Sequence, residues 1–262
     1  PTPTTGIIDP TQRSCTWSQI GLDGPPPARF AHSIDLEPMG ALIMFAGRDF
    51  ATETNYDDVW QYTGSWVDIT PTDAGPRPSP RRGFAAAMHP TLGLIVFGGD
   101  DGNGSTNLPA ETWAFRGDEW TQLSADPSPP VRSFAAMEYH PDSDSVILFG
   151  GNDLQGNVVP GTWALNNAGK WTELMGASPQ ARVFHTMARD ADGDLIMHGG
   201  CAMNTSCTAK LDDTWRWTKG QWEMIHPGGK ATHAGGVMTR ATADGTLFRF
   251  IGGASNIEAY EW

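Results

Sequence analysis

An apolar run that ends in two small residues recurs along the chain. The runs are LIMFAG (42–47), LIVFGG (94–99), VILFGG (146–151), LIMHGG (195–200) and FRFIGG (248–253). The second glycines are spaced by 52, 52, 49 and 53 residues. A fixed period of this length indicates a repeat architecture with a unit of about 50 residues.

Each apolar run is followed by a polar loop and then by an aromatic pair. The first aromatic closes DDVW60, ETW113, GTW163, DDTW215 and the weaker IEAY260, and Trp66, Trp120, Trp171 and Trp222 follow within six to eight residues. The fifth repeat has no such follower, but CTWSQI at 15–20 matches the missing piece. We therefore expect four strands per repeat, with an N-terminal strand completing the C-terminal repeat.

This organisation predicts an all-β chain folded as a five-bladed β-propeller of four antiparallel strands per blade. The 31 glycines and 20 prolines fit the many turns that such a fold needs. A blade cannot bury both faces alone, so closure of the ring stabilises every blade. We expect residues 1–262 to form one domain, with blades at about 29–70, 82–124, 132–175, 182–226 and 230–262 and a closing strand at 15–20.

The glycine pairs, the spaced tryptophans and the Arg-x-x-His or Arg-x-x-Ala starts together resemble the Kelch-repeat β-propeller family. The resemblance covers the chain from about Trp17 to Trp262. It implies a ligand surface at the mouth of the axial channel, formed by the residues that open the inner strands and by the loops after the glycine pairs. Five blades are fewer than the six usual in this family, which implies a narrower channel.

Basic residues open the predicted inner strands and would lie at the channel mouth. They are Arg29, Arg82, Arg132, Arg182 and Lys230, and the loops after the small pairs add Arg48, Asp49, Asp100, Asn152 and Asp153. A positive focus in a chain of net charge −13 favours an acidic peptide or a small carboxylate as ligand. The alternative is that each arginine pairs with a neighbouring loop aspartate and ties the blades together.

Three histidines follow these basic residues by three positions, namely His32, His185 and His233. Convergence near the axis would provide a transition-metal site or a proton-transfer site. Strand alternation instead favours structural histidines in the clefts between blades. A binding function would require no cofactor. If the three histidines converge, a transition metal bound by them is the candidate cofactor.

Charge and cysteine content narrow the classes of partner. The net charge of −13 has no compensating basic cluster, which argues against nucleic acid and against an anionic membrane surface. No apolar run approaches the roughly 20 residues needed to span a bilayer. Cys201 and Cys207 bracket a short loop and are either disulfide-bonded or two free thiols. We expect a monomer and favour an extracellular or periplasmic location.

Two functions of different classes fit these features. The first is a ligand-binding or protein-interaction propeller that uses its channel mouth. The second is a secreted or periplasmic Kelch enzyme acting on a sugar acid as an epimerase or lyase, with His185 or His233 as the base. A structural domain cut from a longer protein is a third interpretation, because fold alone does not fix function.

Overall fold

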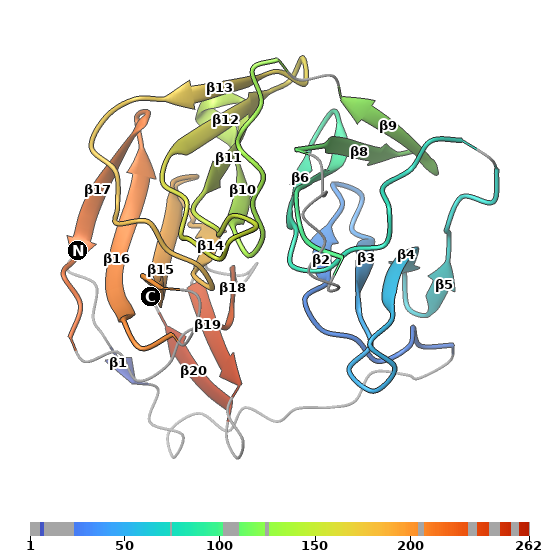
Figure 1. Ribbon diagram of the computed structural model, residues 1–262, viewed down its shortest axis with the longest axis horizontal. Coiled ribbons are helices and arrows are strands. Elements are labelled where there is room, and N and C mark those ends of the chain that lie inside the picture. The colour runs from blue at the N-terminus through green and yellow to red at the C-terminus, as the bar shows by residue number, and fades with distance from the viewer. Residues whose placement is uncertain are drawn as a thin grey trace.

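The computed structural model describes residues 6–7, 24–73, 75–101, 110–123, 126–203, 207–229, 235–240, 247–252 and 257–261. Regular structure in these residues is almost entirely β, with one 3-10 helix at Pro141–Ser143. The strands form four-stranded antiparallel sheets that follow one another around a common axis, with β2, β6, β10, β14 and β18 innermost (Figure 1). The predicted all-β propeller of four-stranded antiparallel sheets is therefore confirmed.

Four blades are each built from consecutive strands. Blade one contains β2 (Ser33–Leu36), β3 (Leu42–Arg48), β4 (Asn55–Tyr62) and β5 (Trp66–Asp68); blade two contains β6 (Ala85–His89), β7 (Gly93–Phe97), β8 (Thr112–Arg116) and β9 (Glu119–Leu123). Blade three contains β10 (Ala136–His140), β11 (Ser145–Phe149), β12 (Thr162–Asn166) and β13 (Trp171–Leu174); blade four contains β14 (Thr186–Arg189), β15 (Leu195–Cys201), β16 (Lys210–Thr218) and β17 (Gln221–His226).

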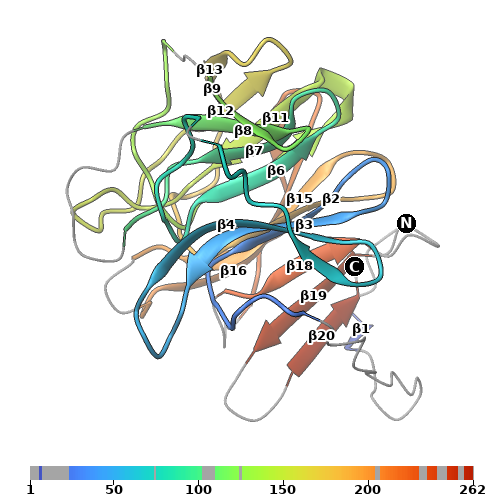
Figure 2. The ribbon, with the colours of Figure 1, turned by 90° about the vertical axis from the view of Figure 1, so that its right-hand side faces the viewer.

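The C-terminal strands form a further sheet with a strand from the other end of the chain. This sheet contains β18 (Val237–Arg240), β19 (Leu247–Gly252) and β20 (Ile257–Glu261), and β1 (Gly6–Ile7) pairs with Tyr260 and Glu261 (Figure 2). An N-terminal segment thus supplies its fourth strand. The sequence placed the closing strand at 15–20, which lies outside the described residues; the described pairing strand is Gly6–Ile7.

The second strand of each complete blade carries the core because neighbouring blades cover both of its faces. In β7 the side chains of Leu94 to Phe97 are fully buried, and every residue of β11 is buried. Such strands read as continuous apolar runs rather than as alternating ones. Phe97 and Phe149 each meet the fourth-strand tryptophan of the next blade, Trp171 and Trp222, with ring centroids 5.5 Å apart.

Those fourth-strand tryptophans also donate hydrogen bonds between blades. The indole of Trp171 donates to Thr112 Oγ1 at 2.8 Å, and that of Trp222 donates to Thr162 Oγ1 at 3.0 Å. Each threonine directly precedes the first tryptophan of its own blade. Blade one has Val59 at this position, and the buried indole nitrogen of Trp120 in blade two has no partner among the described residues.

The small-residue pairs bring the blades together through main-chain hydrogen bonds. The amides of Gly47, Gly99 and Gly151 donate to the carbonyl oxygens of Arg81, Arg132 and Arg182 in the following blades at 2.8–3.0 Å. A Cβ on Gly150 would lie only 2.5 Å from the Arg182 carbonyl oxygen, and its φ of +69° is one that side chains disfavour. Close backbone approach therefore favours glycine at this position of blade three, whereas blade one carries Ala46 there with a φ of 52°.

A second chain of main-chain hydrogen bonds joins the segments that lead into the inner strands. Gly83 donates to Ala31, Phe134 to Gly83, Phe184 to Phe134 and Gly235 to Phe184, over 2.6–3.4 Å. The non-glycine members Ala31, Phe134 and Phe184 all have φ between 53° and 55°. We call this series the backbone collar.

Candidate functional site: the mouth face of the propeller

The mouth face is the end of the propeller that carries the loops after the small-residue pairs and the segments leading into the inner strands. Its equivalent arginines are Arg29, Arg81, Arg132 and Arg182, since each donates from Nη1 at 3.0 Å to the first small residue of its own blade. The acceptors are the carbonyl oxygens of Ala46, Gly98, Gly150 and Gly199. Each Nε donates to the carbonyl two residues earlier.

The alignment of Arg82 with these arginines was wrong by one residue. Arg81 occupies the structural position, and Arg82 takes the next one, where it forms a bridge with Asp100. The matching phenylalanine in RGFA and RSFA suggested Arg82. The spacing to the second glycine was the better signal, because Arg29, Arg81 and Arg182 each precede that glycine by 18 residues.

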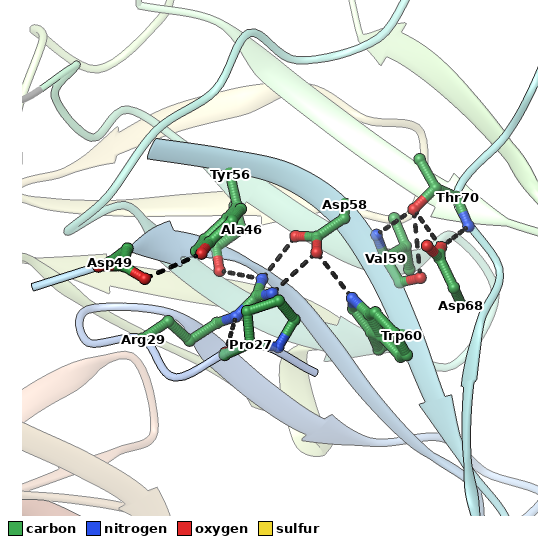
Figure 3. A network of polar contacts seen from close by, with 10 residues as sticks. All are labelled: Pro27, Arg29, Ala46, Asp49, Tyr56, Asp58, Val59, Trp60, Asp68 and Thr70. Atoms are coloured by element: carbon green, nitrogen blue, oxygen red, sulfur yellow. Dashed lines mark hydrogen bonds and ion pairs between the residues drawn. The ribbon is translucent and has the colours of Figure 1, made fainter. Parts of the chain in front are cut away.

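Carboxylates hold three of the four equivalent guanidinium groups. Arg29 Nη2 donates to Asp58 Oδ2 at 2.8 Å, and the same carboxylate accepts the indole N–H of Trp60 at 2.7 Å (Figure 3). In blade two the Glu111 carboxylate accepts hydrogen bonds from Arg81 and Trp113. In blade four the Asp213 carboxylate accepts hydrogen bonds from Arg182 and Trp215. These three arginines therefore pair with carboxylates of their own blades, whereas the alternative interpretation expected loop aspartates that tie neighbouring blades together.

In blade four the tie also affects the ionisation of the carboxylate. Burial alone would raise the pKa of the Asp213 carboxyl, but hydrogen bonds from Arg182 and Trp215 keep that pKa below its ordinary value. The Arg182 side chain is fully buried and that of Asp213 is 15% exposed. Removing either partner would strand a charge away from water.

Blade three lacks this carboxylate. Gly161 stands two residues before Trp163, at the position of Asp58, Glu111 and Asp213. Arg132 is 1% exposed, and its Nη2 has no hydrogen-bond partner among the described residues. Burial lowers the pKa of Arg132 to about 10. The sequence showed the exception in GTW163, but its meaning depends on the three-dimensional position of Arg132.

The accessible part of the mouth face combines aromatic rings with Arg82. Phe30 and Phe50 are 39% and 88% exposed, and their rings meet edge to face at 6.2 Å between centroids. The Arg82 guanidinium lies 5.9 Å from the Phe30 ring and pairs with Asp100 at 2.8 Å. These side chains form the aromatic patch, defined as Phe30, Phe50, Arg82 and Asp100.

The other predicted rim residues are engaged in local contacts. Arg48 donates to Glu53 at 3.1 Å, while its buried Nη1 has no partner among the described residues. Asp49 accepts the amides of two loop residues and the hydroxyl of Tyr56. Asn152 accepts from Ser133 at 3.3 Å, and Asp153 caps its loop through three bonds from Gln155 and Asn157.

The fifth basic residue and the third histidine, Lys230 and His233, lie outside the described residues. The collar aligns Gly235 with Phe184, and β18 begins at Val237 where β14 begins at Thr186. The alignment of Lys230 with the four arginines stays a prediction.

His185 lies in the cleft between blades three and four, as strand alternation predicted. Its ring packs edge-on against Phe149 at 5.7 Å, and a Cβ on Gly150 would lie 2.7 Å from its Cε1. Burial, followed by the charge of Arg182, lowers the pKa of His185 to about 3. His32 is partly buried, and its pKa is also lowered by burial and by Arg29. The described residues contain no group of three potential metal ligands.

An acidic pair marks the inner strands below the mouth face. Burial and then the charge of Glu138 raise the pKa of Asp35 to about 7, whereas Ser33 opposes the shift. Burial also raises the pKa of Glu138, which Arg189 and Arg240 counteract. Asp35 is in β2 and Glu138 in β10, and β6 contacts both strands, so the charge of Glu138 acts on Asp35 past the strand between them.

The cysteine loop at the mouth of blade four is closed by a disulfide between Cys201 and Cys207. Of the two alternatives left open by the sequence, the bonded pair is the one observed. No helix in the described part of the chain has the length and apolar character of a membrane span.

Comparison with known proteins relates the chain to Kelch propellers. The chain is 25% identical to Kelch domain-containing protein 2 of Bos taurus over 223 residues, which is 74% of the chain. It is 27% identical to multiple epidermal growth factor-like domains protein 8 of Homo sapiens over 187 residues, which is 65% of the chain. The aligned parts are 53% and 6% of those proteins, so the chain spans about half of the first and a small part of the second. No family model matches.

The similarity and the fold together confirm the predicted resemblance to Kelch-repeat β-propellers.

Proposed function

We propose that the chain is a single five-bladed propeller domain over residues 1–262 that binds an acidic segment of a partner protein at its mouth face. The sheet of β18, β19, β20 and β1 is the fifth blade in this proposal. Hydrogen bonds from Gly235 to Phe184 and from Arg240 to the Asp190 carbonyl link that sheet to blade four. Closure of the ring against blade one would leave the mouth face as a rigid display surface.

The exposed aromatic patch is the observation that carries the binding proposal. Phe50 is 88% exposed and rests against Phe30, which also faces the Arg82 guanidinium. Aromatic and arginine side chains dominate the binding energy of protein interfaces because they combine large apolar area with directed hydrogen bonds. Arg82 can exchange its partly exposed Asp100 for a carboxylate of the ligand.

The contact set expected for the ligand extends around the mouth. It consists of Arg82, Arg48, Asp49, Asp100, Asn152 and Asp153 at the rim, with Arg29, Arg132, Arg182 and Lys230 from the predicted basic set. In this set Arg29 and Arg182 act by ordering the loops, since their guanidinium groups are held by Asp58 and Asp213. The disulfide supports placement in an oxidising compartment such as the cell exterior or the periplasm.

Calorimetry with matched peptides tests this function. Short peptides that contain glutamate and tryptophan are compared with peptides in which glutamine replaces glutamate. Binding should require glutamate, weaken at high salt, and fall at least about tenfold in Phe50→Ser and in Arg82→Ala.

Arg116→Ala is the matched control, because Arg116 is exposed in the β8–β9 hairpin at the opposite end of blade two. If no peptide binds, or if Arg82→Ala and Arg116→Ala have the same effect, the mouth face is not the interaction surface.

A further inference from the structure

Blade three differs from its neighbours in the chemistry around its buried arginine. In blades one, two and four a carboxylate accepts one bond from arginine Nη2 and one from the first tryptophan, at 2.6–3.2 Å. In blade three neither donor has this acceptor, because position 161 carries no side chain. Arg132 still makes its other two bonds, to the carbonyl oxygens of Pro130 and Gly150.

The unfilled place is bordered by groups that suit an anion. A Cβ built on Gly161 would lie 3.5 Å from the indole nitrogen of Trp163. Arg132 Nη2 is buried without a partner among the described residues, and an unpaired buried guanidinium nitrogen costs free energy that an incoming acceptor recovers. We call this place the blade-three carboxylate position, defined by Arg132 Nη2, Trp163 Nε1 and Gly161.

Glu173 lies beside the position and acts on Arg132 through its charge, which raises the pKa of Arg132 against the larger effect of burial. Its Oε1 would lie 3.3 Å from a Cβ on Gly161, and it stands opposite Trp163 on the neighbouring strand β13. Among the described residues no hydrogen bond joins Glu173 to Arg132 Nη2. Glu173 is an exposed side chain on the last strand of the blade, so it can turn into solvent at low cost.

We infer that the blade-three carboxylate position receives an aspartate or glutamate side chain from the partner segment. The incoming carboxylate accepts from Arg132 Nη2 and from the Trp163 indole, reproducing the arrangement that Asp58 provides in blade one. Such charge-assisted bonds are directional, and the donors are already held by the fold. This inference rests on the proposed function and names the residue that recognises the acidic group.

The test follows tryptophan indole N–H signals in ¹H–¹⁵N spectra during titration with N-acetylglutamate N-methylamide. The signal of Trp163, assigned with Trp163→Phe, should move and saturate. The signals of Trp60, Trp113 and Trp215 should stay in place, because each already donates to a carboxylate of its own blade. The glutamine analogue of the probe should produce no shift.

Four variants separate recognition from indirect effects. Arg132→Gln should weaken the probe at least about tenfold, and Arg132→Lys serves the same purpose if the glutamine variant does not fold. Glu173→Gln should bind as well as the wild type or better, since a like charge has been removed. Asp213→Gly should make the Trp215 signal respond, because it frees Arg182 in the same way.

The inference would be overturned by an unmoved Trp163 signal in the wild type, by equal movement of all the indole signals, or by unchanged binding in Arg132→Gln. Binding that occurs only in Glu173→Gln would also overturn it, by assigning the position to Glu173. A peptide that depends on Phe50 and Arg82 without moving Trp163 would uphold the proposed function and reject this inference. A response of Trp163 to the probe without any peptide binding would show a carboxylate site in blade three and reject the proposed function.

Discussion

Replacing Val59 with threonine should stabilise the protein, although it puts a hydroxyl into a fully buried site. Trp171 and Trp222 donate across blades to Thr112 and Thr162. Val59 holds the equivalent place in blade one, is 0% exposed, and packs in the same cluster as Trp120, whose indole nitrogen finds no partner in the described part of the chain. The substitution keeps the side-chain shape and adds the missing acceptor.

The magnitude follows from two opposing contributions. Pairing a buried N–H removes a cost of about 1–3 kcal/mol. Exchanging a buried methyl for a hydroxyl loses about 0.8 kcal/mol of apolar transfer free energy. The net gain is about 1 kcal/mol, or about 2–4 °C in Tm for a domain of this size.

Urea unfolding monitored by far-UV circular dichroism would measure this gain as a higher midpoint at an unchanged slope. The converse changes Thr112→Val and Thr162→Val should each cost about 1–3 kcal/mol. In a Trp120→Phe background the gain from Val59→Thr should disappear, since the donor is gone. A lower midpoint for Val59→Thr alone, or the same gain without the indole, would refute the reasoning.

Three further expectations concern charge and closure. The pKa of Asp35 is about 7 in the folded protein and 3.8 for a free carboxyl, so ionisation of Asp35 destabilises the fold as pH rises through this range. Asp35→Asn should therefore raise the unfolding free energy by about 2–4 kcal/mol at pH 8 and leave it unchanged at pH 3. Urea unfolding at both pH values would detect the difference. Asp213→Asn should lose about 3–5 kcal/mol at pH 7 by leaving Arg182 unpaired, and the loss should shrink in acid below the carboxyl pKa; an equal loss at pH 2 would contradict the ion-pair explanation. Deleting residues 1–20 removes β1 and exposes the edge of β20, so the deletion variant should melt lower and aggregate by light scattering, and unchanged melting would exclude closure by this segment.

The fold could be predicted from the sequence because the residues that form each blade recur at a regular spacing. Apolar runs at a nearly constant spacing, four of them followed by a tryptophan pair, repeat one local pattern, and each complete blade is built from strands that are consecutive in the sequence. The inter-blade location of His185 followed from strand alternation in the same way. The position of the closing strand was harder to predict, because a two-residue strand such as Gly6–Ile7 has too few side chains to form a pattern.

The candidate site was less predictable because it depends on one-residue register and on contacts between distant segments. Arg81 and Arg82 are chemically identical neighbours, so local matching could not decide which one enters the core. Asp58 and Asp213 bind arginines that lie 29 and 31 residues earlier in the sequence. Such pairs depend on how the strands are arranged in space, and no local pattern in the sequence indicates them. Gly161 matters only once Arg132 is known to point toward it.

The backbone collar has a consequence for how such a protein diversifies. Its bonds use only main-chain groups, and the residues just before its members are chemically unrelated: Phe30, Arg82, Ser133 and Val183. Each of these four nevertheless forms the same bridge to the first residue after the small pair. Evolution can therefore replace the side chains at the rim one blade at a time. Such replacements would change the partners that the surface binds and leave the main-chain hydrogen bonds between blades intact.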